Sequence, residues 1–215
     1  MIVYRPTDGE AHTVPVAMRC RTCFLMTQLG GTIPPEVAGI RDRIEGAFAG
    51  AGFGVVDADS FTTGRDFLLK IWEVIASVPV GVAIIHEDVR PATLANIYYE
   101  LGLMQALGKE TLVVRTPGAA VPSDFVRTEY VVADGRLEQR LAAFIENLHD
   151  REAHYGLVGT LVENNPLLAL DYLRRAYLLF GDAQWQREAA TLVASTDLSE
   201  RATDSVEMLL ASFAR

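Results

Sequence analysis

TLANIYYELGLMQALGK, residues 93–109, is the stretch from which the rest of the chain can be placed. The apolar run Gly81–Ile85 lies before it and the apolar run Thr111–Val114 lies after it. A polar loop containing Pro91 leads into the stretch and Gly108 ends it, which predicts one helix between two buried strands. Glu100 falls in the first half of this expected helix, where nothing about a fold requires a carboxylate.

Strands and helices alternate on both sides of this stretch. Strands are expected at 22–26, 53–56, 80–85, 111–115 and 129–132, and helices at 36–51, 66–77, 93–109 and 137–148. This alternation favours a parallel sheet covered on both faces. The expected fold class is therefore α/β, a five-stranded parallel, flavodoxin-like doubly wound sheet with a C-terminal helical module. Ligands of such sheets bind beyond the carboxyl ends of the strands, where loops 27–35, 57–65, 86–91 and 116–123 are expected to converge.

The pattern becomes purely helical after about residue 151. Helices are expected at 157–162, 167–180, 185–194 and 205–213, and an edge strand at 1–4. The run LLALDYLRRAYLLF (167–180) is too apolar for a free surface helix, so it should pack on the sheet domain, on another copy or on a partner. We expect an N-terminal extension (1–18), an α/β domain (19–150) and a helical module (151–215) through which the chain forms homo-oligomers.

Composition excludes several classes of partner. The chain has 215 residues, half of them hydrophobic, and a formal net charge of −9. Nucleic acid is not expected as a partner because there is no long basic run. No apolar stretch approaches the roughly 18 residues of a membrane span. The N-terminus lacks the features of a signal peptide, which predicts a cytoplasmic protein.

Three familiar motifs are present only in part. Cys20 and Cys23 have CxxC spacing but lie in or beside an expected strand, where residues three apart point to opposite faces, so we interpret them as core residues and expect no metal site. The glycines of GAGFG (50–54) follow a helix and precede a strand, the reverse of the dinucleotide-binding order. Lys109 follows Gly108 without the glycine-rich loop of a Walker A site.

The 93–109 helix carries a more specific pattern. Its residues Asn96-Ile97-Tyr98-Tyr99-Glu100-Leu101-Gly102, followed by Ala106-Leu107-Gly108-Lys109, resemble the N-x-[FY]-Y-E-x-G-x3-A-x-G-K signature of the TIR-like and nucleoside 2-deoxyribosyltransferase-like superfamily. Cys23-Phe24-Leu25-Met26 is similar to its first-strand motif, and Asp57–Asp66 stands where the group has an acidic loop. The resemblance covers residues 19–148.

The resemblance implies a catalytic role for Glu100 at the anomeric carbon of a ribosyl group, as nucleophile or as stabiliser of positive charge. The second acid would be Asp88, with His86 as the alternative, although Asp88 is about one residue further from the glutamate than is usual in the group. Asn96 would orient Glu100 or bind a sugar hydroxyl. The other substrate-binding residues would be Phe24, Met26, Thr27, Gln28, Asp59, Arg65, Asp66 and Tyr99.

Plainer interpretations stand beside these roles. Glu100 is also compatible with a solvated helix residue, Asn96 and Asp66 with helix caps, and His86 with a loop histidine whose hydrogen bonds are satisfied. The implied function is cleavage of the N-glycosidic bond of a nucleotide or nucleoside, with NAD hydrolysis in a bacterial defence or signalling effector favoured. The alternatives are a nucleoside 2-deoxyribosyltransferase and a non-catalytic nucleotide sensor. No cofactor is expected, because NAD or another nucleotide would be the substrate.

Overall fold

The computed structural model describes residues 9–10, 16–61, 67–122, 129–162, 164–196 and 200–213. The chain divides into two compact units. The first combines the described residues up to Arg21 with those from Asn147 onward, and the second runs from Thr22 to Glu146. The edge strand expected at 1–4 lies outside the described residues.

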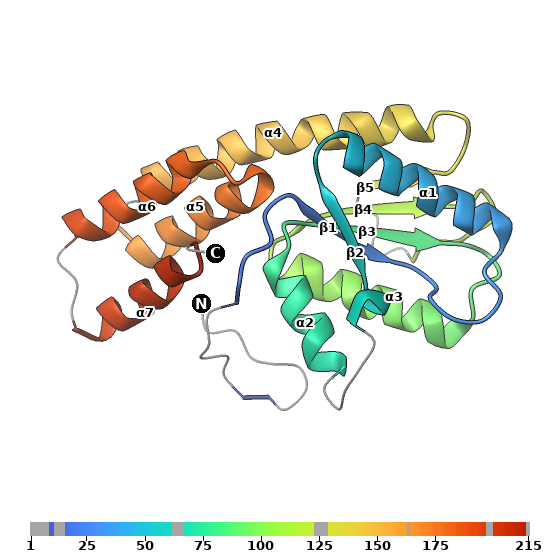
Figure 1. Ribbon diagram of the computed structural model, residues 1–215, viewed down its shortest axis with the longest axis horizontal. Coiled ribbons are helices and arrows are strands. Elements are labelled where there is room, and N and C mark those ends of the chain that lie inside the picture. The colour runs from blue at the N-terminus through green and yellow to red at the C-terminus, as the bar shows by residue number, and fades with distance from the viewer. Residues whose placement is uncertain are drawn as a thin grey trace. The chain divides into compact units, whose positions relative to one another are not determined.

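The second unit is a five-stranded parallel sheet in the order β2-β1-β3-β4-β5. Its strands are β1 (Thr22–Met26), β2 (Gly54–Asp57), β3 (Val80–Ile85), β4 (Glu110–Arg115) and β5 (Glu129–Val132). All four neighbouring pairs are parallel. Helix α1 (Pro35–Gly50) lies on one face, and α2 (Phe67–Ser77) and α3 (Pro91–Ala106) lie on the other (Figure 1). The predicted flavodoxin-like α/β class is confirmed.

Helix α3 corrects one expectation. It starts at Pro91, two residues earlier than expected, because a proline at the first helical position loses no hydrogen bond. It ends at Ala106, ahead of Gly108, whose φ of +66° suits a residue just past a helix end. Glu100 is therefore the tenth of sixteen residues and lies in the second half of the helix. Asn96 is well inside the helix, so its interpretation as a cap is wrong.

The core beneath α3 and α2 is built from apolar side chains of the sheet and of both helices. At Gly81 of β3 the neighbouring side chains come very close to the backbone. A Cβ there would lie 2.7 Å from the Met104 side chain and 2.9 Å from the Met26 side chain. Glycine at this position lets the two methionines close over the sheet. The buried cluster includes Phe24, Met26, Ile71, Val74, Ile75, Ile85, Ile97, Leu101 and Met104.

Helix α4 (Leu137–Leu161) is one continuous helix of 25 residues, where two separate helices at 137–148 and 157–162 were expected. Its two glycines explain why it continues. Gly156 faces the Trp185 ring, and Gly159 faces Leu173. Contacts with these side chains take the place of the helix propensity that the glycines lack.

The first unit consists of helices around a separate apolar cluster. After α4 come α5 (Pro166–Phe180), α6 (Ala183–Ser195) and α7 (Glu200–Ala211). The buried members of the cluster are Met18, Leu170, Leu173, Tyr177, Leu178, Ala189, Val206 and Phe213. Cys20 packs against this cluster, whereas Cys23 lies in β1. One cysteine thus lies in the strand and the other just before it, and both pack among apolar residues, as expected.

Two glycine-to-alanine changes should have opposite effects. At Gly156 the added Cβ would lie 2.0 Å from the Trp185 ring, so we expect Gly156→Ala to lower the free energy of unfolding by about 1–3 kcal/mol. The matched control is Gly46→Ala in α1, where nothing lies within 4 Å and alanine should add about 0.5–1 kcal/mol. Urea unfolding of both variants measures this. A neutral Gly156→Ala would contradict the close packing of Trp185.

Candidate active site at the carboxyl edge of the sheet

The end of β3 is tied to the end of β1 by a buried hydrogen bond. His86 follows β3 and is only 4% exposed, and Gln28, two residues beyond β1, is 6% exposed. Nε2 of His86 lies 3.2 Å from Oε1 of Gln28. The Gln28 amide nitrogen donates to the carbonyl oxygens of Gly30 at 2.9 Å and Thr32 at 3.3 Å. The Gln28 side chain thus forms hydrogen bonds both within its own loop and with His86.

The end of β3 is also tied to the end of β4. Thr116 follows β4, is 1% exposed, and its hydroxyl donates a short hydrogen bond to the carboxylate of Glu87. That hydrogen bond is the main cause that lowers the pKa of Glu87, so this carboxylate is ionised at neutral pH. The loop passes close by at Gly118, where a Cβ would come within 2.8 Å of Glu87. The loops after β3 and β4 therefore form one connected rim.

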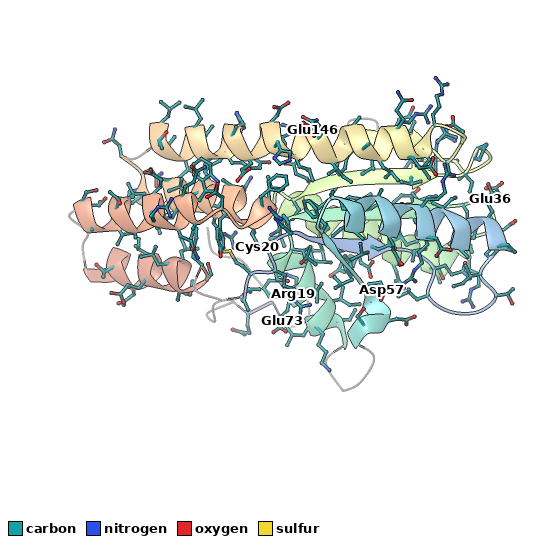
Figure 2. The ribbon with its side chains drawn as sticks, turned by 45° about the horizontal axis from the view of Figure 1, so that its top comes forward. Arg19, Cys20, Glu36, Asp57, Glu73 and Glu146 are labelled. Atoms are coloured by element: carbon teal, nitrogen blue, oxygen red, sulfur yellow. The ribbon has the colours of Figure 1, made fainter. Side chains whose placement is uncertain are left out.

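An ion pair anchors the end of β2. The side chain of Asp57 is 6% exposed and lies 2.6 Å from the guanidinium of Arg41 on α1. Asp57 also accepts hydrogen bonds from the backbone and hydroxyl of Ser60, which shape the 3-10 turn η1 (Ala58–Phe61) (Figure 2). Asp59 lies on this turn and is exposed.

Glu100 is a half-buried acid on α3. Among the residues that the structure describes, none donates a hydrogen bond to its carboxylate and no cation is paired with it. Burial alone raises the pKa of Glu100 to about 7. Removing an acid from water without a partner disfavours its charged form, which is the physical cause of this shift. Perturbed acids of this kind concentrate at functional sites.

The flank of α3 that carries Glu100 can be assigned. Gln105 donates to the hydroxyl of Thr111 on β4, so its flank faces β4. Five residues along a helix turn the side chain by about 140°, which puts Glu100 on the opposite flank. Since β1 lies on the other side of β3 and α2 packs against α3, Glu100 is turned towards α2.

The acids proposed as a pair are well separated along the chain's path. Asp88 is exposed and precedes α3. Glu100 comes nine residues after Pro91, which is about 13 Å of helix axis. Carboxyl groups that act together in retaining glycosidases are about 5 Å apart. The role of Asp88 as second acid stays a prediction, and this spacing does not favour it. His86, the alternative, is hydrogen-bonded to Gln28.

The remaining site residues have varied surroundings. Asn96 is exposed, and Tyr99 is 50% exposed. Phe24 and Met26 are 0% and 1% exposed and belong to the core of the sheet. Thr27 is 8% exposed and begins the loop held by Gln28. Arg65 and Asp66 lie outside the described residues.

Sequence reasoning missed two contacts at this edge. The Glu87–Thr116 bond joins loops 29 residues apart in sequence, and the Arg41–Asp57 ion pair joins α1 to the end of β2. The signal available for the first was a polar residue directly after each of two buried strands. Among the described residues no group of three or more His, Cys, Asp or Glu side chains could hold a metal ion. Within the same residues every helix is too short or too polar to cross a bilayer.

The Arg41–Asp57 pair should contribute more to stability than a matched surface pair on the same helix. Arg41→Met leaves a buried carboxylate without its cation, and we expect a loss of about 2 kcal/mol because Arg41 itself is one third exposed. The control is Arg43→Met, whose partner Glu138 is 60% exposed. Chemical unfolding should show a clearly smaller loss for the control. Equal losses would mean that the burial of Asp57 is unimportant.

Glu100 should make stability depend on pH. Its folded pKa of about 7 lies above the ordinary value of 4.5, so folding favours the protonated form. The protein therefore loses stability as the pH rises from about 4.5 to 7 and gains none back above it. Glu100→Gln should be about 1–3 kcal/mol more stable than the parent at pH 8 and nearly equal at pH 4. Glu73→Gln, at an exposed position of α2 (Figure 2), should show no such difference.

Comparison with known proteins gives a limited result. No protein-family model matches the chain, and no curated protein matches it. Among solved structures, a CMP N-glycosidase from Clostridium botulinum, BcmB, is similar with a TM-score of 0.42 and 16% sequence identity. The match covers 57% of this chain and 98% of that chain. A likeness at this level carries no argument about activity.

Proposed function

We propose that the chain cleaves the N-glycosidic bond of a nucleotide or nucleoside, with Glu100 as the catalytic carboxylate. One observation carries the proposal: Glu100 is a half-buried acid with no hydrogen-bond donor among the described residues and a pKa raised to about 7. A structural carboxylate is normally paired or solvated. The sequence signature around Glu100 supports the same chemistry.

The reaction needs negative charge beside a carbon. When the bond between C1′ and the base nitrogen breaks, its electron pair leaves with the base and C1′ gains oxocarbenium character. The ionised Glu100 carboxylate would stabilise that charge, or add to C1′ and be displaced by water. In either route water supplies the oxygen of the new C1′–O bond and gives up a proton, which goes to the leaving base or to solvent. A raised pKa limits the fraction ionised at low pH, and the positive charge forming at C1′ favours ionisation.

Hydrolysis of a nucleotide such as NAD, in a defence or signalling role, is the finer form of the proposal. Its support is the helical unit beyond Asn147, because a sheet domain of this type needs no such addition for simple base transfer. Transfer of a deoxyribosyl group to a second base is the alternative. For hydrolysis and for transfer alike, we propose that the helical unit assembles the chain into homo-oligomers.

The purified chain should release free base from NAD or from one member of a panel of nucleosides and nucleoside monophosphates. Glu100→Gln should lower kcat by at least about 100-fold, because the charge stabilisation at C1′ is lost. Glu73→Gln should retain full activity, since Glu73 is exposed on α2. Chromatography of the reaction mixtures measures both.

The pH profile separates two roles for Glu100. If the ionised carboxylate acts, kcat/KM should fall about tenfold per pH unit below 7 and be level above it. A profile falling above pH 7 would instead make Glu100 a proton donor. Binding of a nucleotide with no turnover in parent and variant alike would overturn the enzymatic proposal in favour of a sensor.

A further inference from the structure

The direction of the Gln28 side chain is fixed by its own loop. Its amide nitrogen donates to the carbonyl oxygens of Gly30 and Thr32, so the amide cannot be turned over without losing both bonds. Its oxygen therefore faces Nε2 of His86 at 3.2 Å. An amide oxygen only accepts hydrogen bonds, so Nε2 of His86 must carry the proton.

The other ring nitrogen is then determined. A neutral imidazole with a proton on Nε2 has a lone pair on Nδ1. Among the described residues Nδ1 of His86 has no hydrogen-bond partner, and it is absent from the polar atoms that are both buried and unpartnered, so it keeps contact with solvent. A nearly buried histidine at the carboxyl end of the central strand thus keeps one acceptor atom without a partner among the described residues.

The residues around His86 indicate which ligand group its Nδ1 would accept a hydrogen bond from. Glu87, the next residue, is held ionised by Thr116, and the exposed acid Asp88 follows it. A lone pair beside two acids is a poor position for phosphate, which offers only acceptor oxygens. One nearby cation is Arg90, whose Nη2 lies 3.5 Å from the carbonyl oxygen of Gly30 on the loop after β1.

We propose that Gln28 is a positioning residue that holds His86 protonated at Nε2, so that Nδ1 accepts a hydrogen bond from a sugar hydroxyl of the ligand. This inference rests on the proposed nucleotide or nucleoside chemistry. It assigns the sugar to the end of β3 and places any phosphate away from it. It also gives Gln28 a role other than contact with the substrate, because its own polar atoms are already engaged.

NMR of the full chain, labelled with ¹⁵N in its four histidines, tests the tautomer without any turnover. Signals of His86 are assigned with His86→Asn. At pH 9, above the ordinary range of imidazole titration, we expect a proton on Nε2 and none on Nδ1 of His86. A proton on Nδ1 overturns the proposal.

Variants at Gln28 test the positioning. Gln28→Leu removes the acceptor and should raise the share of the other tautomer about fivefold, the factor that one ordinary net hydrogen bond contributes. Gln28→Glu keeps an acceptor oxygen and should restore the parent tautomer. A Gln28→Leu spectrum identical to the parent's for His86 overturns the role of Gln28. If that variant does not fold, the parent tautomer and Gln28→Glu still decide, because a changed tautomer in Gln28→Glu overturns it equally.

Ligand titrations test the sugar assignment. Ribose, adenosine and cytidine are the probes, with inorganic phosphate as the control anion. At least one sugar-bearing probe should shift the Nδ1 signal of His86, and phosphate should not. A shift with phosphate alone, or with none of the probes, overturns the sugar assignment. These titrations measure no cleavage, so they can be interpreted even if the proposed activity fails. If the protein is active but the Nδ1 signal does not shift, the proposed function stands and the sugar assignment is rejected.

Discussion

Burial of β3 on both faces is the constraint on which the second unit depends. Every residue from Val80 to Ile85 is buried, and the strand pairs with β1 on one side and β4 on the other. A strand with no exposed face cannot carry chemistry along its length. Polar groups can begin only where the strand ends, and there the chain places His86, Glu87 and Asp88 in succession. The position of the candidate site follows from the apolar character of the strand.

The same constraint explains why the rim is built from pairs. Strands β1, β3 and β4 end side by side, so polar residues that follow one strand meet polar residues that follow its neighbour. Gln28 meets His86, and Thr116 meets Glu87. Each pair closes a hydrogen bond that would otherwise be lost on burial. The three loops are thereby held as one surface, although they are far apart in sequence.

Some elements of the structure could be predicted from the sequence and others could not. The bounds of β3 were predicted as they stand, because an uninterrupted apolar run of strand length leaves little choice of where the strand begins and ends. The start of α3 was misjudged because Pro91 is compatible with both a loop and a first helical residue. The continuity of α4 could not be foreseen, since what keeps Gly156 helical is the Trp185 ring from α6. The tautomer of His86 could not be predicted from the sequence either, because it depends on carbonyl oxygens of a different loop.

Glu100 shows how a single position can satisfy the fold and the chemistry in opposite ways. Its helix neighbours Ile97, Leu101 and Met104 fill the core, so the backbone there is held rigidly by packing. The carboxylate on the adjoining flank is partly withdrawn from water by that same packing. Withdrawal opposes its charge and weakens the fold at neutral pH, while a charge so held interacts more strongly with a cation formed beside it. A neutral or fully exposed residue here would cost the fold less, and the proposed reaction would give the acid a use that the fold does not give it.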